Sequence, residues 1–205
     1  MDGSNQTAQI HIVLVLLVVC FCDWLVVKYW VGRRWSGGLC VRVLVAYMSQ
    51  TGNTKKVAQA IYDVIPEPKE IRRVEDVTSL EGYDLTFLGF PIHDFGPNKQ
   101  AKAFLETRVK DRSIAFFVTH MAPENAKSLP GWIQRFSDAA VGANIVGVFN
   151  CQGQCSRRVK FSMRVSSNPR LREWARADSS QGQPDATRLE RARTFAKDTL
   201  NKIKP

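Results

Sequence analysis

Residues 43–61 read VLVAYMSQTGNTKKVAQAI, and this stretch decides how the chain folds. The aliphatic run Val41–Tyr47 is typical of a strand buried on both faces, and a loop rich in hydroxyl groups follows it. Apolar residues then recur at helical spacing, at Val57 and Ile61. The first amides of a helix lack intrahelical acceptors, and the helix dipole adds roughly half a positive charge there. The segment therefore predicts an anion-binding pocket between a strand and a helix.

The loop itself suits a terminal phosphate group. It comprises Ser49, Gln50, Thr51, Gly52, Asn53 and Thr54. The hydroxyl groups of Ser49, Thr51 and Thr54 can donate hydrogen bonds, and Gly52 lets the backbone wrap closely around an anion. No lysine ends the loop as in the triphosphate-binding motif, and the three spaced glycines of the pyrophosphate motif are missing. We therefore expect a single phosphomonoester; the alternative is an ordinary strand-to-helix turn capped by Ser or Thr.

Strands and helices alternate along the rest of the chain. Further strands are predicted at Lys69–Val74, Asp84–Phe90, Ser113–Thr119 and Asn144–Asn150. Further helices are predicted from near Pro97, from near Ser128, over Ser156–Val165 and from Asp185, with an irregular stretch before the last one. This order predicts a doubly wound, five-stranded parallel sheet of strand order 2-1-3-4-5 in a three-layer sandwich. Such folds bind ligands at the carboxyl ends of their strands.

Two loops follow the third and fourth strands at that same edge. They contain Pro91, Ile92, His93, Asp94, Phe95 and Gly96 in one case, and Thr119, His120 and Met121 in the other. We expect them to form the two walls of a slot for a flat ring, with about 1 kcal/mol of stacking on each face beyond burial of area. The histidines could exchange protons with a ligand, but packing or binding a turn carbonyl is the favoured role. Asp94 could tune the site by its charge or be a solvated turn residue.

The cysteines do not predict a disulfide framework. Three of the five lie before residue 41, and the other two, Cys151 and Cys155, have no Cys or His pair to complete a metal site. We expect reduced thiols in a cytoplasmic protein, and a buried thiol at Cys151 rather than a redox-active one.

Positive charge is concentrated in the last quarter of the chain. The net charge is +1 over residues 41–150 and +8 over residues 151–205. This asymmetry predicts an acidic partner surface or an anionic substrate. No nucleic-acid recognition motif accompanies it, so we do not expect a nucleic-acid partner.

The chain from Val41 to Lys204 resembles the flavodoxin family. The resemblance is carried by VLVAYMSQTGNTKKVAQAI, FLGFPIHDFGP, FFVTHMAP, GVFNCQGQ and SQGQPDATRLERARTFA. The last four are similar to a subgroup of short flavodoxin-like proteins that includes the accessory protein encoded beside bilirubin reductase. The resemblance implies FMN as cofactor, with its phosphate on residues 49–54 and its ring between the two loops. It also implies a freely rotating peptide at Gly96 that meets the flavin N5. Two features depart from the family: the basic charge, and a tail after Ser166 in which Trp174 is expected near the flavin rim.

Residues 1–40 are expected to be an extension outside the domain at 41–205. The apolar run over residues 10–31 is long enough to span a membrane but contains Asp23 and Lys28. Three interpretations stay open: a membrane anchor that holds the domain on the cytoplasmic side, an upstream over-extension of the reading frame, and an extra buried helix. A secretory signal fits badly, because no basic residue precedes the run.

The expected function is electron transfer by an FMN-binding carrier without catalytic residues or a metal of its own. Its expected partners are a flavin-reducing protein and a partner oxidoreductase with an acidic docking surface. Two alternatives belong to other classes: an NAD(P)H-dependent flavin reductase of a quinone or tetrapyrrole, and a flavin-free docking subunit.

Overall fold

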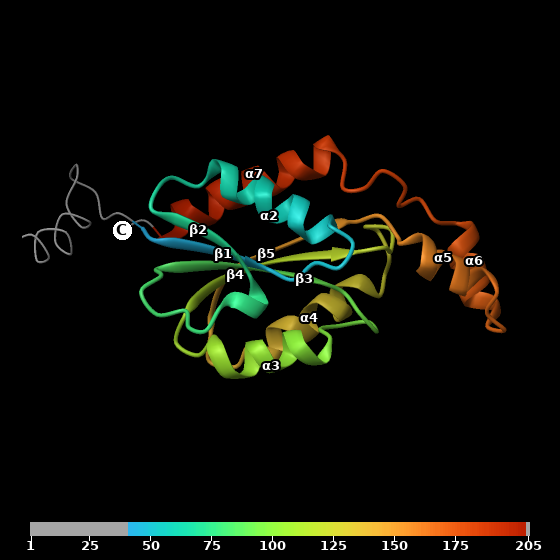
Figure 1. Cartoon of the computed structure of the whole chain (residues 1–205), viewed down its shortest axis with the longest axis horizontal. Helices are drawn as coiled ribbons and strands as arrows, with labels where there is room; N and C mark the ends of the chain where they lie inside the picture. The colour runs from blue at the N-terminus through green and yellow to red at the C-terminus, as the bar shows by residue number, and fades with distance from the viewer. Residues whose placement is uncertain (1–40, 204–205) are drawn as a thin grey trace, which may run out of the picture. The chain divides into compact units, whose positions relative to one another are not determined.

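A five-stranded, all-parallel sheet organises the protein, in a computed structural model that describes residues 41–203. Its strand order is β2-β1-β3-β4-β5, as predicted. The strands are β1 (Val43–Tyr47), β2 (Lys69–Arg73), β3 (Leu85–Pro91), β4 (Ser113–His120) and β5 (Asn144–Gln152). The β1–β2, β3–β4 and β4–β5 crossovers each place an α-helix on one face of the sheet, and the last helix of the chain completes the three-layer sandwich of a doubly wound fold (Figure 1). The predicted flavodoxin-like architecture is confirmed.

Helices cover both faces of the sheet (Figure 1). On one face lie α2 (Asn53–Val64) and α7 (Ala186–Ile203), and on the other lie α3 (Lys99–Arg108) and α4 (Leu129–Ala139). A one-turn 3-10 helix, η1 (Val74–Asp76), follows β2. The remaining helices, α5 (Arg157–Arg164) and α6 (Pro169–Arg176), form a helical hairpin beyond the carboxyl end of β5.

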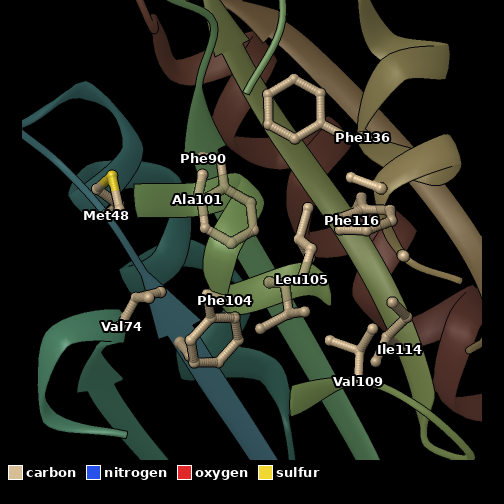
Figure 2. Packing of buried hydrophobic residues seen from close by; sticks show 14 of the residues in the cluster. Met48, Val74, Phe90, Ala101, Phe104, Leu105, Val109, Ile114, Phe116 and Phe136 are labelled. Atoms are coloured by element: carbon tan, nitrogen blue, oxygen red, sulfur yellow. The ribbon is translucent and has the colours of Figure 1, made fainter. Parts of the chain in front are cut away.

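The sheet separates two hydrophobic cores. Phe90, Leu105, Phe116 and Phe136 lie in the core under α3 and α4, where the rings of Phe90 and Phe136 stack with centroids 5.9 Å apart (Figure 2). The second core, under α2 and α7, contains Val57, Ile61, Phe87, Phe117, Ala192 and Ala196. Full burial of a large apolar side chain stabilises the folded state by roughly 1.5–3 kcal/mol. The two cores therefore hold the strands in place, and with them the strand ends at which the candidate site lies.

The helix α6 is the main element that the sequence did not predict. It begins at Pro169, and the side chain of Asn168 caps it by accepting from the amide of Arg170 at 3.0 Å. The predicted strand limits differ from the observed ones by one or two residues; β5 continues through Gln152 because its last residues still pair with β4.

The helical hairpin leaves and rejoins the fold at neighbouring points. The amide of Gln154 donates to the carbonyl of Gln183 at 3.0 Å, and the amide of Gly182 donates to Oε1 of Gln154 at 3.3 Å. These bonds close the two ends of the 155–181 segment on each other.

The predictions for the N-terminal extension, including an anchor at residues 10–31, lie outside the described residues. Between residues 41 and 203, the helices are all too short or too polar to cross a membrane.

Candidate functional site

The predicted anion pocket involves the loop between β1 and α2. The amide of Met48 donates to the carbonyl of Gly89 at 2.8 Å, which extends the β1–β3 pairing one residue beyond β1. The chain then turns, and Gly52 caps α2 in the left-handed conformation with φ 88° and no side-chain cap. A Cβ at Gly52 would meet nothing within 4 Å, so glycine is needed for its backbone angle and not for space.

Hydrogen-bond donors remain free in this loop. Within residues 41–203, the amides of Asn53 and Thr54 donate to no acceptor, as expected for the first turn of a helix, and neither does the amide of Thr51, which precedes the N-cap. The hydroxyl oxygen of Ser49 accepts from the amide of Gly52, and that of Thr51 accepts from Nδ2 of Asn53, each at 3.1 Å. Since both hydroxyl groups act as acceptors, each keeps its own hydrogen for a ligand. The pocket can therefore bind an anion with amide and hydroxyl donors together.

A buried hydrogen bond between Thr54 and Thr119 holds the end of this loop. Their hydroxyl oxygens lie 2.9 Å apart, and the residues are only 1% and 3% exposed. The bond joins the first turn of α2 to the end of β4, so it fixes the helix N-terminus relative to the sheet. Thr54 therefore serves the pocket by holding α2 in place, whereas Ser49 and Thr51 lie on its open side.

The loop after β5 forms a further wall that the sequence indicated only by its place at this edge. Nδ2 of Asn53 donates to the carbonyl of Gln154 at 2.8 Å. A Cβ at Gly153 would lie 2.9 Å from the Cβ of Asn53, which is closer than real Cβ atoms approach. Only glycine admits this contact between the two loops, and a glycine directly after a strand is the signal that could have revealed it.

The loop after β3 ends in a two-residue turn. The amide of His93 donates to the carbonyl of Gly96 at 3.0 Å, and the amide of Gly96 donates back at 2.9 Å. Asp94 and Phe95 between them have φ values of 47° and 67°. Positive φ at both central positions defines a type I′ turn. The carbonyl of Gly96, where the resemblance implies a freely rotating peptide, thus accepts a hydrogen bond from the amide of His93.

The left-handed turn predicts a stability difference at Asp94. We expect Asp94→Gly to be about 1 kcal/mol more stable than Asp94→Ala, because a Cβ in this conformation costs roughly 1–2 kcal/mol and glycine has none. Chemical denaturation of the two variants measures the difference. Equal stabilities would show that the turn stores no strain at this residue.

Phe95 lies in an exposed aromatic cluster. Its ring is 47% exposed, 5.0 Å from the ring of Trp132 in α4 and 6.5 Å from that of Trp174 in α6. Nη1 of Arg135 donates to the Phe95 carbonyl at 3.2 Å. The structure thus brings the loop after β3 and the helical hairpin together through Phe95 and Trp174. In the same loop, Nε2 of His93 is buried and has no partner between residues 41 and 203.

His120 is part of the interior and is not a free wall of the slot. Its Nδ1 lies 2.9 Å from the carbonyl of Ala122, and its Nε2 lies 3.1 Å from the side-chain amide of Asn150. Burial lowers the pKa of His120, and its bonds with Asn150 and Ala122 oppose that shift only in part. The imidazole is therefore neutral near pH 7 and binds a turn carbonyl, which was the favoured of its two predicted roles. Met121, the next residue, is partly exposed and remains the candidate for contact with a ring.

The lowered pKa of His120 predicts a loss of stability in weak acid. Since the unfolded histidine titrates near pH 6.5, the contribution is complete above that pH and is lost as the pH falls further, by up to about 1.4 kcal/mol per pH unit. We expect His120→Gln to flatten this part of the profile, while His93→Gln, which keeps His120, retains it. Free energies of unfolding between about pH 7 and pH 5 measure the slopes. Parallel profiles for the wild type and His120→Gln would contradict the assignment.

An ion-pair network joins the loop after β4 to α7. Glu124 binds Arg188 at 2.9 Å and Arg191 at 2.8 Å, and its Oε1 accepts from the amide of Gln152 at 3.3 Å. Burial acts to raise the pKa of Glu124, but the bonds from Arg191 and Gln152 outweigh it and lower the pKa below its ordinary value. Nε2 of Gln152 donates to the carbonyl of Met121 at 3.0 Å, so the network also positions that loop. No sequence motif indicated these contacts.

Both described cysteines are buried free thiols. Burial raises the pKa of Cys151 to about 12, and burial also raises the pKa of Cys155. Since the thiolate is the reactive form, neither group is activated at neutral pH.

The fold defines a doubly wound α/β protein of the flavodoxin-like class, with the start of α2 at the carboxyl end of its first strand. The family model of the flavodoxin domain matches residues 44–197. The chain therefore belongs to the flavodoxin domain family.

Among proteins of known sequence, the chain is similar to the flavodoxin-like domain-containing protein BilS of Clostridioides difficile (strain CD3). The two are 32% identical over 173 residues, which is 79% of this chain and 98% of BilS. Solved structures confirm the fold. A flavodoxin from the domain Archaea matches with a TM-score of 0.51 at 15% identity, over 80% of this chain and 99% of that one. A short-chain flavodoxin associated with a non-canonical PDU bacterial microcompartment matches with a TM-score of 0.52 at 13% identity, over the same shares.

Proposed function

We propose that this protein binds FMN and carries single electrons between a flavin-reducing protein and a partner oxidoreductase. The observation that carries the proposal is the β1–α2 loop, in which unpaired amides and two hydroxyl donors surround a helix N-terminus. Membership of the flavodoxin domain family supports the same cofactor.

The residues at the site fit FMN. Its phosphate would be held by Ser49, Thr51 and the amides that begin α2, and no carboxylate in the loop 48–54 would repel a dianion. Its ring would lie beside residues 91–96 on one side and Met121 on the other. When bound, FMN supplies reversible transfer of one or two electrons.

A carrier role is supported by the state of the histidine in the loop after β4. The two ring nitrogens of His120 face Ala122 and Asn150, and burial lowers the pKa of the ring, so His120 is poorly placed to protonate a bound substrate. The residues at this edge are therefore better suited to binding and orienting a cofactor than to acid–base catalysis. The free thiols support a reducing compartment, and we propose the cytoplasm.

Titration with FMN and with riboflavin tests the cofactor and the pocket together. Riboflavin has the same ring but no phosphate. Hydrogen bonds to a charged group contribute about 1.5–3 kcal/mol each, so losing two of them predicts at least a hundredfold weaker binding of riboflavin. Fluorescence quenching of the flavin measures both affinities. Equal affinities, or no binding of FMN, would overturn the proposal.

Mixing with NADPH separates a carrier from a reductase. We expect the flavin of the FMN-loaded protein to stay oxidised when NADPH is added alone, and to be reduced when a flavin-reducing protein is also present. Stopped-flow absorbance follows the flavin. Rapid reduction by NADPH alone would favour the reductase alternative.

A further inference from the structure

We propose that the α5–α6 hairpin is the docking surface for an electron-transfer partner, and that this partner presents an acidic protein surface. The inference rests on the proposed function, which it deepens by naming the surface and the chemistry of the partner. Three observations carry it: unpaired arginines, exposed apolar side chains between them, and a direct contact with the loop after β3.

The hairpin carries positive charge that its own fold does not use. Lys160 pairs with Asp178 at 2.7 Å, and Arg172 donates to the carbonyls of Ser166 and Ser167 at 2.7 and 3.0 Å. These contacts hold the two helices together. The remaining arginines are exposed and pair with no carboxylate within residues 41–203: Arg157, Arg158, Arg164, Arg170 and Arg176. Five free guanidinium groups on sixteen helical residues attract an acidic surface strongly.

Large apolar side chains are exposed among these arginines. Phe161 of α5 and Val165, the C-cap residue directly after that helix, are each 66% exposed and lie four residues apart in the sequence. Arg158 and Arg164 lie three residues on either side of Phe161. Aromatic and arginine side chains together are typical of protein interfaces, in which the apolar groups are buried on docking.

The hairpin also contacts the edge at which the ring is proposed to lie. Trp174 of α6 is 44% exposed, and its ring centroid lies 6.5 Å from that of Phe95 in the loop after β3. A partner bound to α5 and α6 would therefore lie next to the loop after β3, where the flavin ring is proposed to bind. A lipid surface would also accept basic helices with exposed apolar residues. It would cover this edge without accepting an electron, which favours a protein partner.

A matched pair of acceptors tests the charge preference: cytochrome c, which is basic, and its succinylated form, whose lysines have become carboxylates around the same haem. We expect the photoreduced, FMN-loaded protein to reduce the succinylated form at least tenfold faster at low ionic strength. Added salt should remove the difference. Equal rates for the two acceptors would overturn the proposal.

Two double variants separate the hairpin from the net charge of the protein. Arg158→Glu with Arg164→Glu should slow the reduction of succinylated cytochrome c at least tenfold at low ionic strength. Lys110→Glu with Lys197→Glu makes the same change of charge at exposed positions elsewhere and should change the rate by less than twofold. Equal slowing by both pairs would show that only net charge matters and would overturn the proposal.

A second pair of variants tests the contribution of the exposed apolar side chains to docking. Phe161→Ser should weaken binding of succinylated cytochrome c severalfold, whereas Val141→Ser, at a residue that is 74% exposed outside the hairpin, should leave it unchanged. Calorimetry measures this binding on the flavin-free protein. Docking can therefore be seen even if FMN binding fails, and FMN titration of each variant reports on the proposed function separately.

Lipid is tested by sedimentation with phosphatidylglycerol vesicles. Strong sedimentation that the Arg158→Glu and Arg164→Glu pair abolishes, without binding to succinylated cytochrome c, would overturn the assignment of a protein partner. Weak sedimentation together with binding to succinylated cytochrome c supports it.

Discussion

Thr51→Glu is expected to lower the affinity for FMN at least a thousandfold. Thr51 is exposed in the β1–α2 loop, and its hydroxyl group accepts one hydrogen bond, from Nδ2 of Asn53. A carboxylate there would meet the phosphate in the pocket. Two unit charges about 4 Å apart repel by about 4 kcal/mol at an effective dielectric constant of 20, and the phosphate carries more than one charge. That energy alone corresponds to roughly a thousandfold.

Thr194→Glu is the matched control. Thr194 is exposed in the middle of α7, and its hydroxyl group donates only to the carbonyl of Glu190. We expect this variant to bind FMN as the wild type does. Fluorescence titration measures both affinities, and circular dichroism shows that both variants fold. Near-normal FMN binding by a folded Thr51→Glu variant would rule out the β1–α2 loop as the phosphate site.

Among the glycines of residues 41–203, Gly89 is the one at which substitution by alanine should destabilise the protein most. Gly89 lies in β3 next to Phe117 of β4, and the added Cβ would overlap the terminal atoms of that ring and lie 2.9 Å from Cδ2. Phe117 is fully buried and has no room to turn away. Overpacking of this kind costs about 1–3 kcal/mol, and we expect the upper end. For a domain of this size, that predicts a fall in Tm of roughly 6–12 °C.

Two further variants show whether steric overlap is the cause. Gly131→Ala places the same methyl group in α4, where nothing lies within 4 Å, and should stabilise the protein by up to about 1 kcal/mol. Phe117→Leu removes ring atoms from the overlap, so Gly89→Ala should cost less in its presence. Thermal and chemical denaturation of the four proteins gives the coupling energy. Simple additivity of Gly89→Ala and Phe117→Leu would exclude the overlap as the origin of the loss.

The parts of the fold that depend on local pattern could be predicted from the sequence. The buried strands appear in the sequence as continuous apolar runs. The hydroxyl-rich loop could be located because it lies between the first of these runs and a segment with helical spacing. The helix α6 could not be predicted in this way, because Ala175 is its only buried residue and one buried position makes no apolar stripe. The start signal at Asn168 and Pro169 is present, but a cap alone does not define a helix.

The details of the site depend on contacts between distant residues. The burial of His120 follows from its bonds with Ala122 and with Asn150, which is thirty residues away, and no local pattern specifies the second. The contact of Asn53 with Gln154 joins residues 101 positions apart. Sequence reasoning found the strand ends at which the functional side chains lie. It could not predict which of these side chains are buried, because burial depends on contacts between residues that are distant in the sequence.

The closure of the hairpin at its base has a consequence for how such proteins diversify. Because Gln154 bonds to both Gly182 and Gln183, the 155–181 segment begins and ends at almost the same place. The hydrogen bonds that join these two ends involve Gln154, Gly182 and Gln183 and no side chain of the helices between them. If the hairpin docks the partner as proposed, changes of sequence in α5 and α6 would alter which redox protein binds while the base of the hairpin keeps its hydrogen bonds.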